Sequence, residues 1–244
     1  MVGMTDNLNR QTRNALRICD FLMIAAVLFI LVTALAMILY PGGDYLDSQT
    51  THYSLTRNFF SDLGVSRTYS HAANDASMIL FIISMVLVGV SIILFSFNYW
   101  VIYRERKRGL LLGRLAVASA VMSGVAFIAI TANPWNINLA GHLLMVQQSF
   151  IFLVIFIFLI LALQLLNGWP KLWAGLGIAY VVLLVVYLVL QRLGADISTT
   201  KGLMMQAVEQ KAFIYVSIVV LGLQAYGMRQ VILEGESRRG VHGE

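Results

Sequence analysis

Long, continuously apolar stretches separated by short polar connections dominate this sequence. Continuous apolar character predicts helices, because the strands of a membrane barrel alternate between apolar and polar positions. A helix needs about 20 apolar residues to cross a bilayer, and each stretch reaches that length. The pattern predicts an all-α polytopic membrane protein, a six-transmembrane-helix bundle forming a single integral membrane domain over residues 1–244, with spans at about 18–40, 72–98, 110–132, 139–167, 172–192 and 203–228.

Composition agrees with the pattern. Apolar residues make up 59% of the chain and charged residues only 12%, whereas soluble domains carry about 25% charged residues. The mean hydropathy is +0.79. The connections between the apolar stretches leave no room for a soluble catalytic domain, so any activity belongs in the membrane or at its surface.

Lysine and arginine are unevenly divided between the two sets of connections, which predicts the orientation of the chain. One set, which includes both termini, holds twelve: Arg10, Arg13, Arg17, Arg104, Arg106, Lys107, Arg108, Arg114, Lys171, Arg229, Arg238 and Arg239. The other set holds five: Arg57, Arg67, Arg192, Lys201 and Lys211. Because cytoplasmic connections carry the excess of positive charge, we expect cytoplasmic N- and C-termini. This topology, rather than binding to nucleic acid, explains the net charge of +5.

The first span admits a second interpretation. Arg10 to Arg17, the following apolar run and Ala34-Leu35-Ala36 imitate a signal peptide with its small-residue cleavage site. Asp20, early in the run, and the continuation of the run to Tyr40 favour an uncleaved span. The single cysteine, Cys19, excludes an internal disulfide.

The first outward connection, residues 41–71, has the pattern of a short amphipathic helix. Four apolar residues share one helical face: Leu55, Phe59, Phe60 and Leu63. Ser54 or Thr56 can cap its start, and Gly64 can stop it in a left-handed conformation. We expect this helix to lie on the outer membrane surface or to fold back over the bundle.

A stripe of small residues in the third span predicts close helix packing. Ala116, Ala120 and Gly124 are spaced by four residues, with Ser119 and Ser123 beside them. Small side chains at this spacing allow two helices to approach closely. We assign the stripe to packing inside the bundle.

Polar and ionisable residues gather near the outward ends of the spans, where they are candidates for a functional site. His71 and Asp75 are four residues apart and are expected to share a helical face and to pair. The candidates for ligand binding, expected to converge from four segments on one water-accessible mouth, are Asn58, Ser61, Asp62, His71, Asp75, Asn133, His142 and Glu209.

Three interpretations of this cluster stay open, and no catalytic residue is assigned. His52, His71 and His142 would suit zinc, although no two of them have the close spacing of a metal motif. Ser61, His142 and an aspartate are the residue types of an acid–base or hydrolase site. The third interpretation is a hydrogen-bonded clamp that holds the outer connection on the helices. No cofactor other than zinc is suggested.

Two segments resemble a known family. Asn58-Phe59-Phe60-Ser61-Asp62-Leu63-Gly64 and the segment from Asn133-Pro134 to His142 are similar to the bacterial six-helix membrane family called domain of unknown function 998. That family is similar in layout to the Frag/DRAM/Sfk group, whose members are linked to lipid handling. The resemblance implies a role for Ser61, Asp62, Gly64 and His142 and a location in the bacterial cytoplasmic (inner) membrane.

A looser likeness links the chain to the ceramidase-like membrane hydrolases, which use seven spans and a histidine-bound zinc. This sequence departs from them in having six spans and no paired histidines in its last span. That departure argues against zinc-dependent hydrolysis.

These observations favour a membrane protein that binds or senses a lipid or small amphiphile at an outward polar mouth. The alternatives are a membrane-embedded hydrolase or lipid-remodelling enzyme, and an accessory structural subunit of a larger membrane complex. The expected partners are membrane lipids and either a membrane-protein partner or further copies of the chain, with no nucleic acid.

Overall fold

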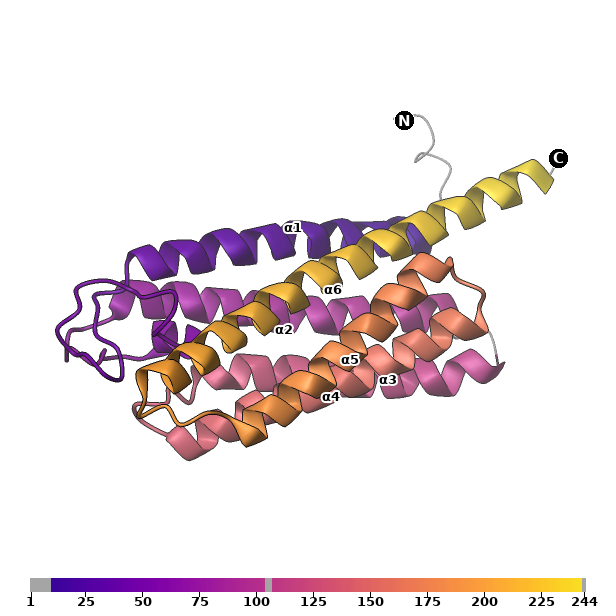
Figure 1. The fold of residues 1–244 in the computed structure, drawn as a ribbon. Coiled ribbons are helices and arrows are strands. Elements are labelled where there is room, and N and C mark those ends of the chain that lie inside the picture. Colours follow the sequence, from indigo (N-terminus) through magenta and orange to yellow (C-terminus); the bar gives the residue numbers. More distant parts are fainter. Residues whose placement is uncertain (1–9, 104–106, 243–244) are drawn as a thin grey trace.

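The computed structural model describes residues 10–103 and 107–242, which form a bundle of long helices (Figure 1). The helices are α1 (Arg10–Ile38), α2 (Asp75–Tyr103), α3 (Lys107–Thr131), α4 (Leu139–Leu166), α5 (Lys171–Leu193) and α6 (Thr200–His242), with a short 3-10 helix, η2 (Phe60–Gly64), in the first connection. Within the described residues, six helices are long and apolar enough to cross a membrane, and β-structure is limited to one isolated bridge. The prediction of an all-α six-helix membrane bundle is confirmed.

The ends of several helices differ from the predicted spans. α1 begins at Arg10 and α2 ends at Tyr103, beyond the apolar positions on which the prediction rests. α6 continues to His242, well past the expected end near residue 228. Helical hydrogen bonds form in water as well as in lipid, and glutamate and arginine are good helix formers, so polar turns extend a span without a change of conformation.

Each helix packs against the next one in the chain, and α6 returns to α1, so the six close into a ring. Connections 39–74, 132–138 and 194–199 lie at one end of the bundle, which we call the loop end (Figure 1). α1 begins and α6 ends at the opposite end. The even number of helices places both ends of the described chain together, as the topology requires.

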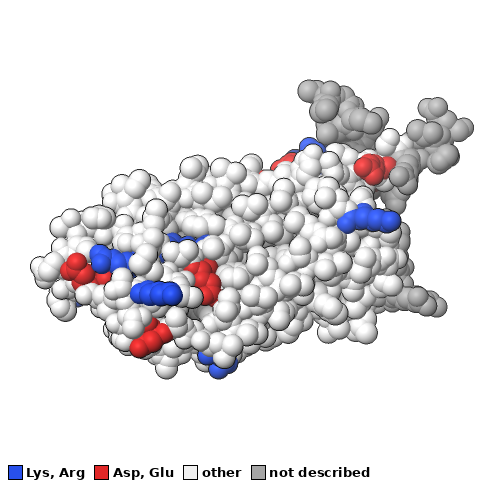
Figure 2. All heavy atoms as spheres, in the orientation of Figure 1, with Lys and Arg blue, Asp and Glu red and all other residues white. Residues whose placement is uncertain are grey.

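The outward faces of the helices are apolar. Large side chains on several helices are half exposed or more, among them Leu31 of α1, Ile79 of α2 and Val182 of α5. Charged side chains gather toward the two ends of the molecule, and a broad band between them is free of charge on the face seen in Figure 2. A lipid environment accepts such a surface, because the backbone polar groups of each helix are satisfied internally.

α2 and α3 approach closely where their glycines meet. A Cβ placed on Gly89 would lie 2.5 Å from the Gly124 carbonyl oxygen, and the converse distance is the same. Ala116 and Ala120, on the same stripe, are fully buried, and Ser123 Oγ donates to the Ser149 carbonyl of α4 at 2.8 Å. The prediction that this stripe packs inside the bundle is confirmed.

The amphipathic helix expected in the first connection is reduced to the five residues of η2. Phe60 and Leu63 are buried, but Leu55 is 64% exposed, so the four apolar residues do not share one face. Phe60 packs against the rings of Phe29 and Phe81. The segment therefore folds back over the bundle. Hydrogen bonds from its own side chains, described below, take the place of those of a regular helix.

The close α2–α3 contact predicts a difference between two identical substitutions. Gly89→Ala should lower the free energy of unfolding by about 1–3 kcal/mol, since its methyl group overlaps the backbone of α3. Gly175→Ala in α5 is the control, because a Cβ there meets nothing within 4 Å. Unfolding in mixed detergent micelles measures both; equal stabilities would contradict the tight crossing.

Candidate functional site

The buried carboxyl group of Asp62 organises the loop end. Its Oδ2 accepts hydrogen bonds from the Phe59 backbone N–H at 2.9 Å and from Asn58 Nδ2 at 3.0 Å. Its Oδ1 accepts one from Trp135 Nε1, in the 132–138 connection, at 3.1 Å. Asp62 and Asn58 are almost completely inaccessible. These bonds set the shape of η2 and attach the first connection to the 132–138 connection.

Lys211 of α6 also belongs to this arrangement, through its contact with Asn58. Its Nζ donates to the backbone carbonyl of Asn58 and lies 5.5 Å from the centre of the Tyr53 ring. Asn58 therefore links the two charged residues, since its side chain donates to Asp62 while its carbonyl accepts from Lys211. We call Asn58, Asp62, Trp135 and Lys211 the clamp.

Burial raises the pKa of Asp62 to about 6, against an ordinary value of 3.8. The hydrogen bonds from Asn58, Phe59 and Trp135 and the charge of Lys211 oppose this rise, because each stabilises the carboxylate. Removal of water outweighs them. Asp62 consequently binds a proton more readily in the folded protein than in the unfolded chain.

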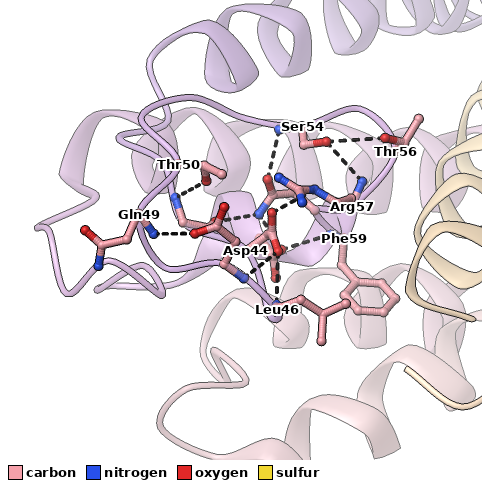
Figure 3. A network of polar contacts seen from close by, with 12 residues as sticks. Asp44, Leu46, Gln49, Thr50, Ser54, Thr56, Arg57 and Phe59 are labelled. Atoms are coloured by element: carbon pink, nitrogen blue, oxygen red, sulfur yellow. Dashed lines mark hydrogen bonds and ion pairs between the residues drawn. The ribbon is translucent and has the colours of Figure 1, made fainter. Parts of the chain in front are cut away.

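A second acidic residue, Asp44, holds the outer part of the first connection (Figure 3). Its Oδ2 pairs with Arg57 Nε at 3.0 Å, and its Oδ1 accepts from the backbone N–H groups of Leu46 and Asp47, both at 3.0 Å. Gly43 has φ +85°, a left-handed conformation that glycine adopts without a steric cost. The connection is thus a folded structure with its own polar centre.

The 132–138 connection positions the side chain of His142. Its Nδ1 lies 3.0 Å from the Asn133 carbonyl oxygen, and the residue is 4% exposed. Trp135 stacks on Tyr69 with ring centres 4.9 Å apart, and Asn136 Nδ2 donates to Ser66 Oγ at 3.0 Å. The 39–74 and 132–138 connections therefore form one unit at the loop end of the bundle.

A cleft of about 550 Å³ lies between these connections and the loop ends of α4, α5 and α6. Of the predicted residues, four line it: Ser61, Asp62, His142 and Glu209. Leu139, Leu143 and Leu190 form an apolar wall on α4 and α5. A smaller apolar pocket of about 50 Å³ in the bundle interior shares His142 and Ser61 with the cleft.

The other four predicted residues lie elsewhere. Asn58 belongs to the clamp, behind Asp62, and Asn133 supports His142 from outside the cleft. His71 and Asp75 are exposed and do not line the cleft. The expected pairing of these two on one helical face is wrong, because α2 begins only at Asp75 and His71 occupies a turn with φ 64°.

The three histidines are not brought together. His52 and His71 are exposed, whereas His142 of α4 is buried beside the 132–138 connection. Over residues 10–103 and 107–242, no three His, Cys, Asp or Glu side chains are grouped closely enough to hold a metal ion. Ser61 and His142 line the same cleft, but the structure has no hydrogen bond between them.

Sequence reasoning left important residues out of the candidate site. The distribution of charge places Lys211 only among the five basic residues of the second set, although a buried lysine is rare and indicates a specific partner. Trp135 has no place among the predicted site residues, and its bond to Asp62 spans 73 positions. Gln206 and Gln210 also line the cleft. No spacing in the sequence relates these residues to the first connection.

Fold and cleft together define an integral membrane protein with six apolar helices and a hollow at one end. No family model, curated protein or solved structure matches the chain. A function for the cleft is therefore inferred from the residues that line it.

The hydrogen bond from Trp135 predicts that one tryptophan contributes to stability where another does not. Trp135→Phe keeps the aromatic ring but removes a donor from a buried carboxylate, so unfolding free energy should fall by about 1.5–3 kcal/mol. Trp100→Phe is the matched control, because Trp100 Nε1 is buried without a hydrogen-bond partner in the described chain. Thermal unfolding of both variants in one detergent tests this; equal losses would contradict the clamp.

The raised pKa of Asp62 predicts a particular pH dependence. The folded protein holds the proton more tightly, so the contribution of Asp62 to stability is greatest below pH 3.8 and is lost as the pH rises through about 6. The total loss is about 3 kcal/mol. Unfolding measured from pH 4 to pH 7.5 should show this decline in the wild type relative to Asp62→Asn, and parallel profiles would contradict it.

Proposed function

We propose that this integral membrane protein binds or senses a lipid or small amphiphile in the cleft at its loop end. The observation that supports this proposal is that one cleft has two chemically different walls. Ser61, His142 and Glu209 supply polar groups, whereas Leu139 and Leu143 supply apolar surface. An amphiphile is the class of ligand that satisfies both walls at once.

The apolar wall also faces outward from the bundle. Leu139 and Leu143 on α4 are each 56% exposed, and Leu190 on α5 is 41% exposed. Their surface is therefore shared between the cleft and the surroundings of the helices. An acyl chain lying between neighbouring lipids could reach the cleft along these leucines without crossing a polar barrier.

The geometry favours binding over hydrolysis. The carboxyl group of Asp62 already accepts three hydrogen bonds from the chain, and none of them comes from His142. The clamp also separates the structural role of the cluster from the ligand site, because Asn58 and Lys211 do not line the cleft. Asp62 and Trp135 belong to both, while Ser61, His142 and Glu209 remain for a ligand.

The resemblance to the domain of unknown function 998 family is part of this proposal. Membership would place the protein in a bacterial cytoplasmic membrane. With the termini in the cytoplasm, as the distribution of basic residues predicts, the cleft would open toward the outer side of the membrane. An amphiphile of the outer leaflet would then be the ligand.

A single substitution in the apolar wall tests the proposal. Leu143→Trp should fill the cleft and lower the fraction of protein that carries a bound amphiphile by about tenfold or more, since overpacking costs more than 1.4 kcal/mol. Native mass spectrometry of protein extracted in mild detergent measures this fraction.

The neighbouring variant Leu144→Trp is the control, because Leu144 is also half exposed on α4 but does not line the cleft. It should carry the same bound mass as the wild type. A wild type without any bound amphiphile, or equal occupancy in the two variants, would overturn the proposal.

A further inference from the structure

We infer that the head group recognised in the cleft is uncharged and rich in hydroxyl groups, as in a monoacylglycerol or a glycosylated lipid. This inference rests on the proposed amphiphile function and specifies its ligand. The inference rests on side-chain polar atoms that line the cleft and have no partner within the described chain. Whether such an atom donates or accepts follows from the hydrogen bond that the other polar atom of the same side chain makes.

His142 presents an acceptor. The Asn133 carbonyl oxygen can only accept a hydrogen bond, so the contact at 3.0 Å requires the proton on His142 Nδ1. In the neutral ring, Nε2 then carries a lone pair. The structure has no hydrogen bond from the described chain to Nε2, and His142 lines the cleft, so this nitrogen is available to a ligand donor.

Two glutamines of α6 are oriented by backbone groups in the same way. Gln206 Nε2 donates to the Ala195 carbonyl, which leaves Gln206 Oε1 as an acceptor. Gln210 Oε1 accepts from the Phe60 backbone N–H at 2.7 Å, which leaves Gln210 Nε2 as a donor. Both residues line the cleft, so α6 offers it the Gln206 acceptor and the Gln210 donor, each oriented by a bond to the backbone, and one further N–H of Gln206.

Glu209 lies between these glutamines in α6 and has a carboxylate oxygen that lacks a hydrogen-bond donor. Its Oε1 is buried and has no hydrogen-bond partner among the described residues. A buried polar atom without a partner costs about 1–3 kcal/mol, and a hydroxyl donor from a ligand would remove that cost. Ser61, which also lines the cleft, can donate or accept.

The cleft therefore presents acceptors and donors side by side, and this mixture selects the head group. His142 Nε2, Gln206 Oε1 and Glu209 accept, whereas Gln210 Nε2 and the second N–H of Gln206 donate. A hydroxyl group donates as well as accepts, but an ionised phosphate ester has only acceptors for such a site.

Charge leads to the same result. Asp62 and Glu209 line the cleft against one basic residue, Arg192, which is exposed. Lys211, the buried lysine, is engaged by the clamp and does not line the cleft. An anionic head group would thus meet two acidic residues and no buried cation, so like-charge repulsion would disfavour it.

Two amphiphiles that differ only by a phosphate test this inference. The full-length protein is placed in phosphatidylcholine nanodiscs containing equal mole fractions of 1-monooleoylglycerol and 1-oleoyl-lysophosphatidate, and the retained ligands are quantified by native mass spectrometry. We expect monooleoylglycerol to be retained about tenfold over lysophosphatidate, the factor that one hydrogen bond to a charged group supplies. Glu209→Gln should reduce this preference severalfold, and the exposed-residue control Asp75→Asn should leave it unchanged.

The outcomes separate the two proposals. Retention of lysophosphatidate or of phosphatidylcholine in place of monooleoylglycerol would overturn the uncharged head group but leave amphiphile binding intact. An unchanged preference in Glu209→Gln would overturn the selection by Glu209 argued above. Retention of none of the three lipids would overturn the proposed function and this inference with it. Free glycerol in the buffer is a further arm: displacement of monooleoylglycerol by free glycerol would mean that the site takes a soluble polyol, which would overturn the lipid assignment.

Discussion

The loop end of this protein depends on the burial of one carboxyl group. Asp62 is removed from water, and its two oxygens accept three hydrogen bonds, two from the neighbouring residues Asn58 and Phe59 and one from Trp135 in another connection. A buried charge without partners would cost several kcal/mol, so the donors of Asn58, Phe59 and Trp135 have to be held in place. Meeting this demand closes the first connection over the bundle and joins it to the second. Residues of both connections line the cleft.

The membrane explains why this polar structure lies at one end. Helices with apolar outward faces satisfy their own backbone groups and can be surrounded by lipid along their length. Charged side chains are costly near the bilayer centre, so they gather at the ends of the molecule (Figure 2). Close packing of α2 and α3 through Gly89 and Gly124 keeps the bundle narrow on one side. Space remains at the loop ends of α4, α5 and α6, where the cleft lies.

Within the loop end, the structure divides the polar residues by task. Asn58 orients the buried carboxylate, the charge of Lys211 stabilises it, and both residues are buried outside the cleft. His142, Glu209 and Gln206 keep atoms that the chain does not use. A clamp and a binding site are therefore neighbours that share Asp62 and Trp135, rather than competing descriptions of one cluster. Bonds to the backbone of Asn133, Ala195 and Phe60 hold His142, Gln206 and Gln210 in position, which is the preorganisation that selective binding requires.

The sequence by itself determined the six membrane helices, because continuous apolar character is a local property of each segment. It located the small-residue contact of α3 for the same reason, since the spacing of the small residues lies within one helix. It also grouped Ser61, Asp62, His142 and Glu209 at one end of the bundle, where they line the cleft. Only the tertiary structure decided that Asp62 bonds Trp135, that Lys211 is buried beneath Asn58, and that His71 and Asp75 stay outside the cleft. These outcomes depend on contacts between residues far apart in the chain and on where α2 begins. Neither the long-range contacts nor the start of α2 leaves a periodic signal in the sequence, since both are set by competition for buried hydrogen bonds.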